Sequence, residues 1–340
     1  MSVLRNAIRS LSALALLAPA IIIALPDFAA ADVWREGAPM TTGRAFAGGA
    51  LIGSELYVVG GDSTSGPRTD AEIYDIRGDI WRAAPSLPAG LLQFGMAEFG
   101  GRIYVAGGYE ALPAERPQMG IFNGADAQSA ASEGDSAKAW VYDPQVGTWI
   151  GIASMPAARA GHGFVVSGSR IYALGGRGEA ASRVWTYDPA ANSWQQVGEP
   201  MPAPRVAAAY VAANGRIYVI GGLIEGNATA RVDIFEPTTG RWQSGPALPS
   251  PRAGHVAAEM NGRIHVTGGE QRRPPRTYGD HFVLDAGSNS WRRAASMPSP
   301  RHGAVAAVAD GKLVVVGGSP GAGVYTVFTE SDVVDIYSEE

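Results

Sequence analysis

The stretch GHVAAEMNGRIHVTGGEQRRPPRTYGDHFVLDAGSNSW, residues 254–291, decides the fold. It opens with an apolar run from Gly254 to Glu259, and Asn261-Gly262 then suits a two-residue hairpin turn that needs positive φ. Residues Arg263 to Thr267 alternate in polarity before a glycine pair, and a third run covers Asp280 to Asp285. A turn and a run with a tryptophan follow. The stretch therefore predicts four short antiparallel strands.

The same unit recurs six times along the chain, and each copy has a Gly-Gly pair after an apolar strand. A tryptophan lies 26 residues before the pair in five copies and 27 before it in one. The glycine pairs are Gly60-Gly61, Gly107-Gly108, Gly175-Gly176, Gly221-Gly222, Gly268-Gly269 and Gly317-Gly318. The tryptophans are Trp34, Trp81, Trp149, Trp194, Trp242 and Trp291. Such periodicity is typical of a repeat architecture with one supersecondary element per unit.

The unit resembles the kelch repeat, which combines a glycine doublet, a Tyr-Asp pair, a tryptophan and a Met-Pro-x-x-Arg segment. Tyr142-Asp143 and Tyr187-Asp188 match the second feature, and residues 155–159, 201–205 and 297–301 match the last. The resemblance covers residues 33 to 338. It implies an all-β fold, a six-bladed kelch β-propeller with four antiparallel strands per blade.

The two ends of the repeat region predict how the ring closes. The strand expected from Val33 to Pro39 carries a tryptophan but has no blade before it, and the last unit lacks a tryptophan strand after Val333 to Tyr337. If the N-terminal strand joins the C-terminal blade, the sixth blade is complete and no open sheet edge remains. Residues 32–340 are therefore expected to form a single propeller domain.

The first 31 residues have the order of a secretory signal peptide. A basic start precedes an apolar stretch from Leu11 to Leu25, and the small residues Ala29 to Ala31 follow. A membrane anchor is the alternative, but about 15 apolar residues interrupted by a proline fall short of the roughly 20 that span a bilayer. We therefore expect a signal peptide over residues 1–31, a periplasmic or secreted protein, and no membrane insertion after cleavage.

Composition excludes several classes of function. The net charge is −5 with no lysine or arginine cluster, which argues against nucleic acid as a partner. The chain has no cysteine, so it has no thiolate nucleophile or thiolate metal ligand, and an oxidising compartment is tolerated. A copper oxidase resembling galactose oxidase is also excluded, because that chemistry needs a Cys-Tyr crosslink and a Tyr-His pair. We expect no cofactor and no metal.

One face of the propeller is expected to carry the function. Loops after the second and fourth strands of each blade open on this loop face, and an insertion of about 21 residues, at roughly 112–137, lengthens one of them. Long loops on a rigid scaffold often bind ligands, although a passive surface excursion is the alternative. Within the loop after the fourth Gly-Gly pair, Glu225 and Arg231 are candidate ligand-binding residues, with simple surface pairing as the other interpretation.

A repeated arginine, 16 residues before the glycine pair, is the main candidate ligand group. If these guanidiniums reach the channel mouth, they suit a carboxylate or phosphate; otherwise they belong to the repeat and bond to carbonyls between blades. His302 follows one of them and could also reach the mouth, whereas His162 and His255 are predicted to be packed or capping groups. The repeated arginines are Arg44, Arg159, Arg205, Arg252 and Arg301.

Two functions remain open at this point. The first is a recognition scaffold that binds a saccharide or a protein on the loop face, and we predict this one. The second is an enzyme, because the chain is similar to the periplasmic sialic acid mutarotases (N-acetylneuraminate epimerases), six-bladed kelch propellers with a signal peptide. In that family the glutamate of a Gly-Glu pair lies six residues before the arginine of an Arg-Thr pair. Gly269-Glu270 and Arg276-Thr277 match this pattern. The resemblance implies catalytic roles for Glu270 and Arg276.

Overall fold

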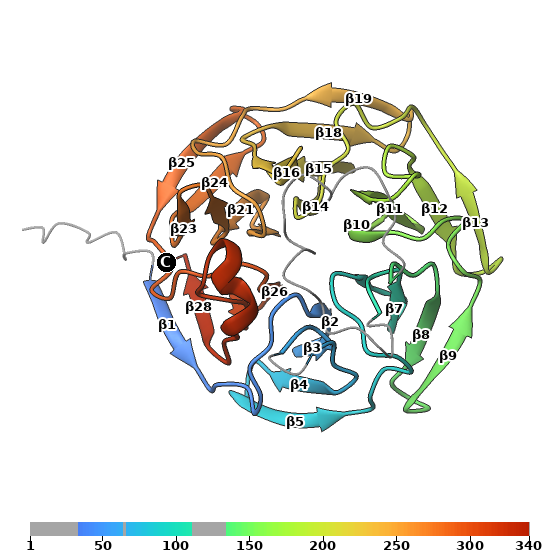
Figure 1. The fold of residues 1–340 in the computed structure, drawn as a ribbon, viewed down its shortest axis with the longest axis horizontal. Helices are drawn as coiled ribbons and strands as arrows, with labels where there is room; N and C mark the ends of the chain where they lie inside the picture. The colour runs from blue at the N-terminus through green and yellow to red at the C-terminus, as the bar shows by residue number, and fades with distance from the viewer. Residues whose placement is uncertain (1–32, 64–65, 111–133, 340) are drawn as a thin grey trace, which may run out of the picture.

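The computed structural model describes residues 33–63, 66–110 and 134–339. These residues form six four-stranded antiparallel sheets arranged as blades around a central axis (Figure 1). The predicted all-β, six-bladed propeller is therefore confirmed. The signal peptide predicted over 1–31 and residues 112–133 of the predicted insertion lie outside the described residues.

In each blade the strands follow one another from the axis to the rim. Blade one has β2 (Gly48–Ile52), β3 (Glu55–Val59), β4 (Ala71–Asp75) and β5 (Ile80–Ala84). Blade two has β6 (Gly95–Phe99), β7 (Arg102–Ala106), β8 (Ala139–Asp143) and β9 (Thr148–Ile152). Blade three has β10 (Ala160–Ser167), β11 (Arg170–Arg177), β12 (Trp185–Asp188) and β13 (Ser193–Gln196).

The remaining blades follow the same plan, with the last one completed from the other end of the chain. Blade four has β14 (Ala209–Ala213), β15 (Arg216–Ile220), β18 (Val232–Glu236) and β19 (Arg241–Ser244). Blade five has β20 (Val256–Met260), β21 (Arg263–Thr267), β24 (His281–Asp285) and β25 (Ser290–Ala294). Blade six has β26 (Val305–Ala309), β27 (Lys312–Val316), β28 (Val334–Ser338) and, as its outer strand, β1 (Val33–Gly37).

The ring closes as the sequence predicts. Strand β1 runs antiparallel to β28, with Val33 opposite Ser338 and Gly37 opposite Val334. Figure 1 shows β1 on the outer rim with the other fourth strands, so the two ends of the chain share one blade. The sheet of blade six therefore has no missing outer strand.

The repeated tryptophans explain how neighbouring blades are joined. Each lies in an outer strand, and its indole N–H donates to a carbonyl in or beside the outer strand of the preceding blade, at 2.7 to 3.1 Å. The pairs are Trp34 with Ala295, Trp81 with Ala38, Trp149 with Pro85, Trp194 with Ala153, Trp242 with Glu199 and Trp291 with Pro246. The tryptophan is thus a contact between blades as well as a core residue.

The apolar core lies between adjacent blades and is not on the axis. Strand β27 shows this, because Leu313 and Val315 pack in the cluster shared with blade five, while Val314 and Val316 pack in the cluster shared with blade one. Successive side chains of a strand point to opposite faces, so a fully apolar central strand serves both neighbours. The residues at the start of the inner strands surround the axis itself.

Additional short elements rise from the connections between second and third strands. They are the hairpin β16 (Leu223–Ile224) and β17 (Asn227–Ala228), the hairpin β22 (Glu270–Arg272) and β23 (Pro275–Thr277), and the 3-10 helix η2 (Gly323–Phe328). They belong to blades four, five and six, and they lie on the loop face among the described residues (Figure 1). Among the described residues, no helix has both the length and the apolar character needed to cross a bilayer.

Candidate functional site

The five repeated arginines lie inside the blades, each at most 1% exposed. Arg301 shows the pattern: its Nε donates to the Gly317 carbonyl at 2.7 Å, its Nη2 to the Val315 carbonyl at 2.9 Å, and its Nη1 pairs with the buried Asp335. These partners belong to the arginine's own blade. The same holds for the carbonyl partners of Arg44, Arg159, Arg205 and Arg252.

This placement corrects the expectation of a ring of ligand-binding arginines. A guanidinium without exposed surface, already bonded to carbonyls and carboxylates, presents no donor to a ligand. The structural interpretation fits better, with one change: the arginine ties the end of the second strand to its own blade and does not bridge two blades. None of the five lines the cavity described next.

An axial cavity of about 170 Å³ lies at the loop-face end of the axis, and all six blades contribute to it. Its wall consists mainly of two rings of residues, two and three positions after the repeated arginine, or after Leu91 in blade two. We call the first ring the belt: Phe46, Gln93, Gly161, Ala207, Gly254 and Gly303. The second is the wall ring: Ala47, Phe94, His162, Ala208, His255 and Ala304.

The belt is held by its own backbone. All of its members have positive φ, including the non-glycine residues Phe46 (55°), Gln93 (55°) and Ala207 (53°). Each such non-glycine residue costs roughly 1–2 kcal/mol, so the surrounding structure must enforce it. Backbone N–H groups donate from blade to blade around the axis, as from Phe46 to the Gly303 carbonyl and from Gln93 to the Phe46 carbonyl, at 2.7 and 3.1 Å. Side chains therefore decide what the cavity can bind.

Two buried histidines of the wall ring, His162 and His255, line the cavity. They are 7% and 5% exposed, and their ring nitrogens have almost no accessible surface, so these atoms do not face a ligand in the cavity. Burial lowers the pKa of both to about 3, and the charges of Arg159 and Arg252 add to these shifts. A hydrogen bond with the backbone of Ile220 opposes the shift at His255. Both imidazoles are therefore neutral at physiological pH.

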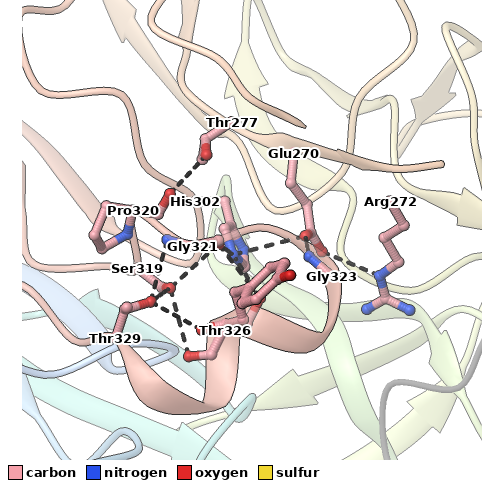
Figure 2. A network of polar contacts seen from close by, with 11 residues as sticks. Glu270, Arg272, Thr277, His302, Ser319, Pro320, Gly321, Gly323, Thr326 and Thr329 are labelled. Carbon is pink, nitrogen blue, oxygen red and sulfur yellow. Dashed lines mark hydrogen bonds and ion pairs between the residues drawn. The ribbon is translucent and has the colours of Figure 1, made fainter. Parts of the chain in front are cut away.

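A second polar group surrounds Glu270, which is 4% exposed and lines the cavity (Figure 2). Its Oε1 accepts from Arg272 Nε at 3.1 Å, and its Oε2 accepts from the Gly323 N–H at 2.7 Å. His302 Nε2 lies 3.7 Å from the same Oε2 and also contacts the Gly321 carbonyl at 2.8 Å. Glu270 thus links the hairpin of blade five to η2 in blade six beside the cavity.

The predicted catalytic pair is not brought together. In the β22–β23 hairpin Glu270 is opposite Thr277, and Arg276 is opposite Gln271. Directly opposed residues share a face of a hairpin and successive residues alternate, so Arg276 and Glu270 point to different sides. Arg276 is exposed and stacks on the Tyr278 ring, 5.1 Å from its centroid. The cation beside Glu270 is Arg272, two residues along the strand.

The second predicted loop pair is also separated. Arg231 donates through Nε and Nη2 to the buried Asp233, at 2.7 and 2.6 Å. Glu225 lies exposed at the turn of the β16–β17 hairpin, with φ of 49°. Neither residue lines the axial cavity. The structure therefore gives no support to a ligand site built from Glu225 and Arg231.

His302, a predicted ligand-binding residue, lines the cavity. The sequence analysis did not identify Arg177, Gln93 and Phe46, which also line it. Arg177 Nη1 donates to Gln93 Oε1 at 3.1 Å, and its Nε donates to Asp135 at 2.9 Å. Asp135 belongs to the predicted insertion, so the end of that segment is anchored beside the cavity. Alignment of the six repeats on the arginine position identifies the belt residues, and this signal was present in the sequence.

Asp62, on the loop face, is expected to make the stability of the fold depend on pH. It occupies in blade one the position that Glu270 has in blade five, directly after the glycine pair. Burial raises the pKa of Asp62 to about 6, the nearby Glu330 adds to the shift, and the Ser63 N–H opposes it. The folded state then holds a proton that the unfolded state has lost between pH 4 and 6, so Asp62 should destabilise the fold as the pH rises through this window.

We therefore expect the Asp62→Asn variant to lose part of the decline in unfolding free energy between pH 4 and 6. Urea titrations of both proteins at several pH values measure this difference. Asp332, which lies exposed before β28, provides a matched Asp332→Asn control. Parallel stability curves for Asp62→Asn and the parent protein would contradict the expected protonation of Asp62.

Comparisons with known proteins agree with this architecture. A family model described as the KLHDC2/KLHL20/DRC7 Kelch-repeats domain matches residues 96–318, and a Kelch motif model matches residues 43–88. Kelch-like protein 15 of Danio rerio is 40% identical over 63 residues, and that of Homo sapiens is 38% identical over 63 residues. Each alignment covers 18% of this chain and 10% of the relative, so the matched part is about a tenth of those proteins.

A solved structure, that of YjhT, shares the fold. It superposes with a TM-score of 0.70 and 18% sequence identity, covering 87% of this chain and 95% of that chain. At this identity the likeness concerns the arrangement of the blades alone. The residues of the axial cavity must therefore be interpreted from this chain itself.

Proposed function

Because the chain belongs to the family of kelch-repeat domains, with most of its propeller matched by that family's model, we propose that it is a recognition scaffold that binds a small saccharide on its loop face. The axial cavity carries this proposal, since all six blades contribute to it and its wall combines aromatic and polar side chains. Ligand sites are typically concave, largely apolar and equipped with a few placed polar groups. The propeller supplies a rigid frame for such a site.

The size of the cavity favours a small ligand over a protein segment. A cavity of about 150 Å³ holds one benzene molecule. The axial cavity, at about 170 Å³, therefore fits a single ring, such as one monosaccharide unit, better than a folded loop or a long oligosaccharide. Its composition also suits a sugar, because Phe46 and Phe94 offer apolar surface to C–H groups while Gln93, Arg177 and Glu270 offer hydrogen-bonding atoms.

Filling the cavity should abolish binding without unfolding the protein. In the Ala208→Phe variant a phenylalanine would stand at the wall-ring position that Phe94 has in blade two, and because Tyr210 fills the space beside the preceding blade, the ring is expected to enter the cavity. We expect calorimetric affinity for neutral monosaccharides to fall at least tenfold while the melting temperature stays close to that of the parent protein. The matched control is Ala190→Phe, the same change at an exposed turn between β12 and β13, on the opposite face. Equal binding by all three proteins would contradict an axial site.

A sugar mutarotase is the second candidate, and Glu270 is the observation that favours it. A mutarotase needs a base to take the anomeric hydroxyl proton and an acid to give a proton to the ring oxygen as the ring bond breaks. Glu270 lies 3.7 Å from His302 in the cavity wall. However, Arg272 Nε and the Gly323 N–H both donate to the carboxylate, so each of its oxygens already has a partner within the protein. NMR of freshly dissolved anomers distinguishes the candidates, because a scaffold leaves their equilibration rate unchanged.

A further inference from the structure

We infer that Gln93 is a ligand-binding residue that sets the specificity of the axial cavity, because its side-chain amide donates to a sugar oxygen that acts as an acceptor. This inference rests on the proposed function and adds to it one binding residue and the ligand group that it contacts. That group is a hydroxyl, ether or carbonyl oxygen in its role as acceptor. An ammonium or another group that can only donate does not fit this position.

Gln93 carries the one polar side chain of the belt. The other five positions hold Phe46, Ala207 and three glycines, and the glycines show that the ring of backbone contacts needs no side chain there. Gln93 has φ of 55°, which is uncommon for a residue other than glycine and costs free energy. A glutamine held at this cost in the wall of a cavity is a candidate for a functional role.

Arg177 fixes the orientation of the Gln93 amide. Arg177 Nη1 lies 3.1 Å from Gln93 Oε1, and because a guanidinium can only donate, the oxygen end of the amide must face it. Arg177 is in turn held by Asp135, whose side chain is 0% exposed, with 2.9 Å between Arg177 Nε and Asp135 Oδ2. The network therefore leaves the nitrogen end of the Gln93 amide for other contacts.

The amide nitrogen of Gln93 can be reached by a ligand. The side chain lines the axial cavity and is only partly buried. Its Nε2 has no hydrogen-bond partner within the described residues and keeps accessible surface, unlike the ring nitrogens of His162 and His255. An amide nitrogen carries two hydrogens and does not accept, so a ligand atom that bonds to it must be an acceptor.

One substitution of equal size separates this role from a purely structural one, in which Gln93 only accepts from Arg177. Gln93→Glu keeps an oxygen for the Arg177 bond but replaces the donor nitrogen with a second acceptor. The variant is therefore expected to fold with a melting temperature close to that of the parent protein. Gln145→Glu, the same change at an exposed turn between β8 and β9 on the opposite face, is the matched control.

The probes are the methyl α-glycosides of D-galactose, D-glucose and D-mannose, together with analogues in which one hydroxyl group is replaced by hydrogen or by fluorine. A hydroxyl donates and accepts, fluorine bound to carbon accepts weakly and cannot donate, and hydrogen does neither. At the ring position that contacts Gln93, hydrogen should lower the affinity roughly three- to tenfold, the usual strength of one hydrogen bond, and fluorine should lower it less. Calorimetry of each protein with each analogue measures these differences.

We expect the parent protein and Gln145→Glu to bind in the order hydroxyl, fluorine, hydrogen at one ring position. In Gln93→Glu the fluorine analogue should become the weakest of the three at that position, because fluorine then faces a carboxylate. An unchanged order in Gln93→Glu, or a parent protein for which fluorine never surpasses hydrogen, overturns the inference but leaves a saccharide scaffold in place. If the parent protein binds none of these glycosides, the proposed function falls and the inference falls with it.

Discussion

Replacing Arg301 with methionine is expected to lower the free energy of unfolding by about 3–5 kcal/mol, as when one partner of a buried ion pair is removed. The change leaves the carboxylate of Asp335, which is 0% exposed, without its cation. It also removes the donors to the carbonyls of Gly317 and Val315 at the end of β27. Urea unfolding followed by tryptophan fluorescence measures the loss.

Two further variants show whether burial is the cause. Arg77→Met removes an ion pair with Asp310 in which the side chains are 69% and 48% exposed, and it should cost far less stability because solvent screens such a pair. In the double variant Arg301→Met with Asp335→Leu, no buried charge remains, so much of the lost stability should return. If Arg301→Met were as mild as Arg77→Met, the arginine would not be structural, and its predicted role in ligand binding would have to be reconsidered.

The fold could be predicted from the sequence because its requirements are local and repeated. Gly60 and Gly61 have φ of 61° and 92°, and a Cβ at Gly61 would lie 2.7 Å from the Ala45 carbonyl oxygen. Only glycine meets both demands at that position, so the pair recurs in every blade. The tryptophan recurs for a comparable reason, since its indole N–H bonds to the preceding blade. Ring closure followed from counting these features at the two ends of the chain.

The candidate site could be predicted only in part, because it depends on the direction in which side chains point as much as on their positions in the sequence. A recurring arginine indicates a repeated task, but spacing does not tell whether the guanidinium points toward the axis or back into its blade. The choice of Arg276 as the partner of Glu270 failed for a related reason. The register of the β22–β23 hairpin places Arg276 opposite Gln271, on the other side from Glu270. Register is a property of the turn and cannot be deduced from a separation of six residues.

The cavity itself is a consequence of symmetry that one repeat cannot reveal. A belt position that holds Phe46 in blade one and Gly161 in blade three looks unremarkable within each unit. Only the closed ring places the six equivalent residues around one axis. Their different side chains then face one shared cavity. The asymmetry between aromatic and imidazole sides of the wall therefore arises from the sequence differences among repeats at a single position.

Removal of β1 is expected to have the largest effect on the whole fold. Without Val33–Gly37, five residue pairs with β28 are lost, and each backbone hydrogen bond in such a ladder contributes about 1 kcal/mol. The Trp34 contacts with Ala295, His281 and Tyr337 go with them. The combined loss is several kcal/mol, comparable with a total stability of about 5–15 kcal/mol. We expect a protein that unfolds at least 15 °C lower or fails to fold cooperatively.

A further experiment distinguishes loss of stability caused by the open edge of β28 from a general effect of shortening the chain. With β1 absent, β28 becomes an open edge whose backbone N–H and C=O groups can pair with other chains. The truncated protein should therefore form concentration-dependent oligomers in size-exclusion chromatography with light scattering. A synthetic peptide of residues 32–39 should restore both the monomer and most of the melting temperature, whereas a peptide of the same residues in scrambled order should not. A truncated protein that stays monomeric and melts within a few degrees of the parent would show that blade six is stable with three strands and that closure by β1 does not hold the ring together.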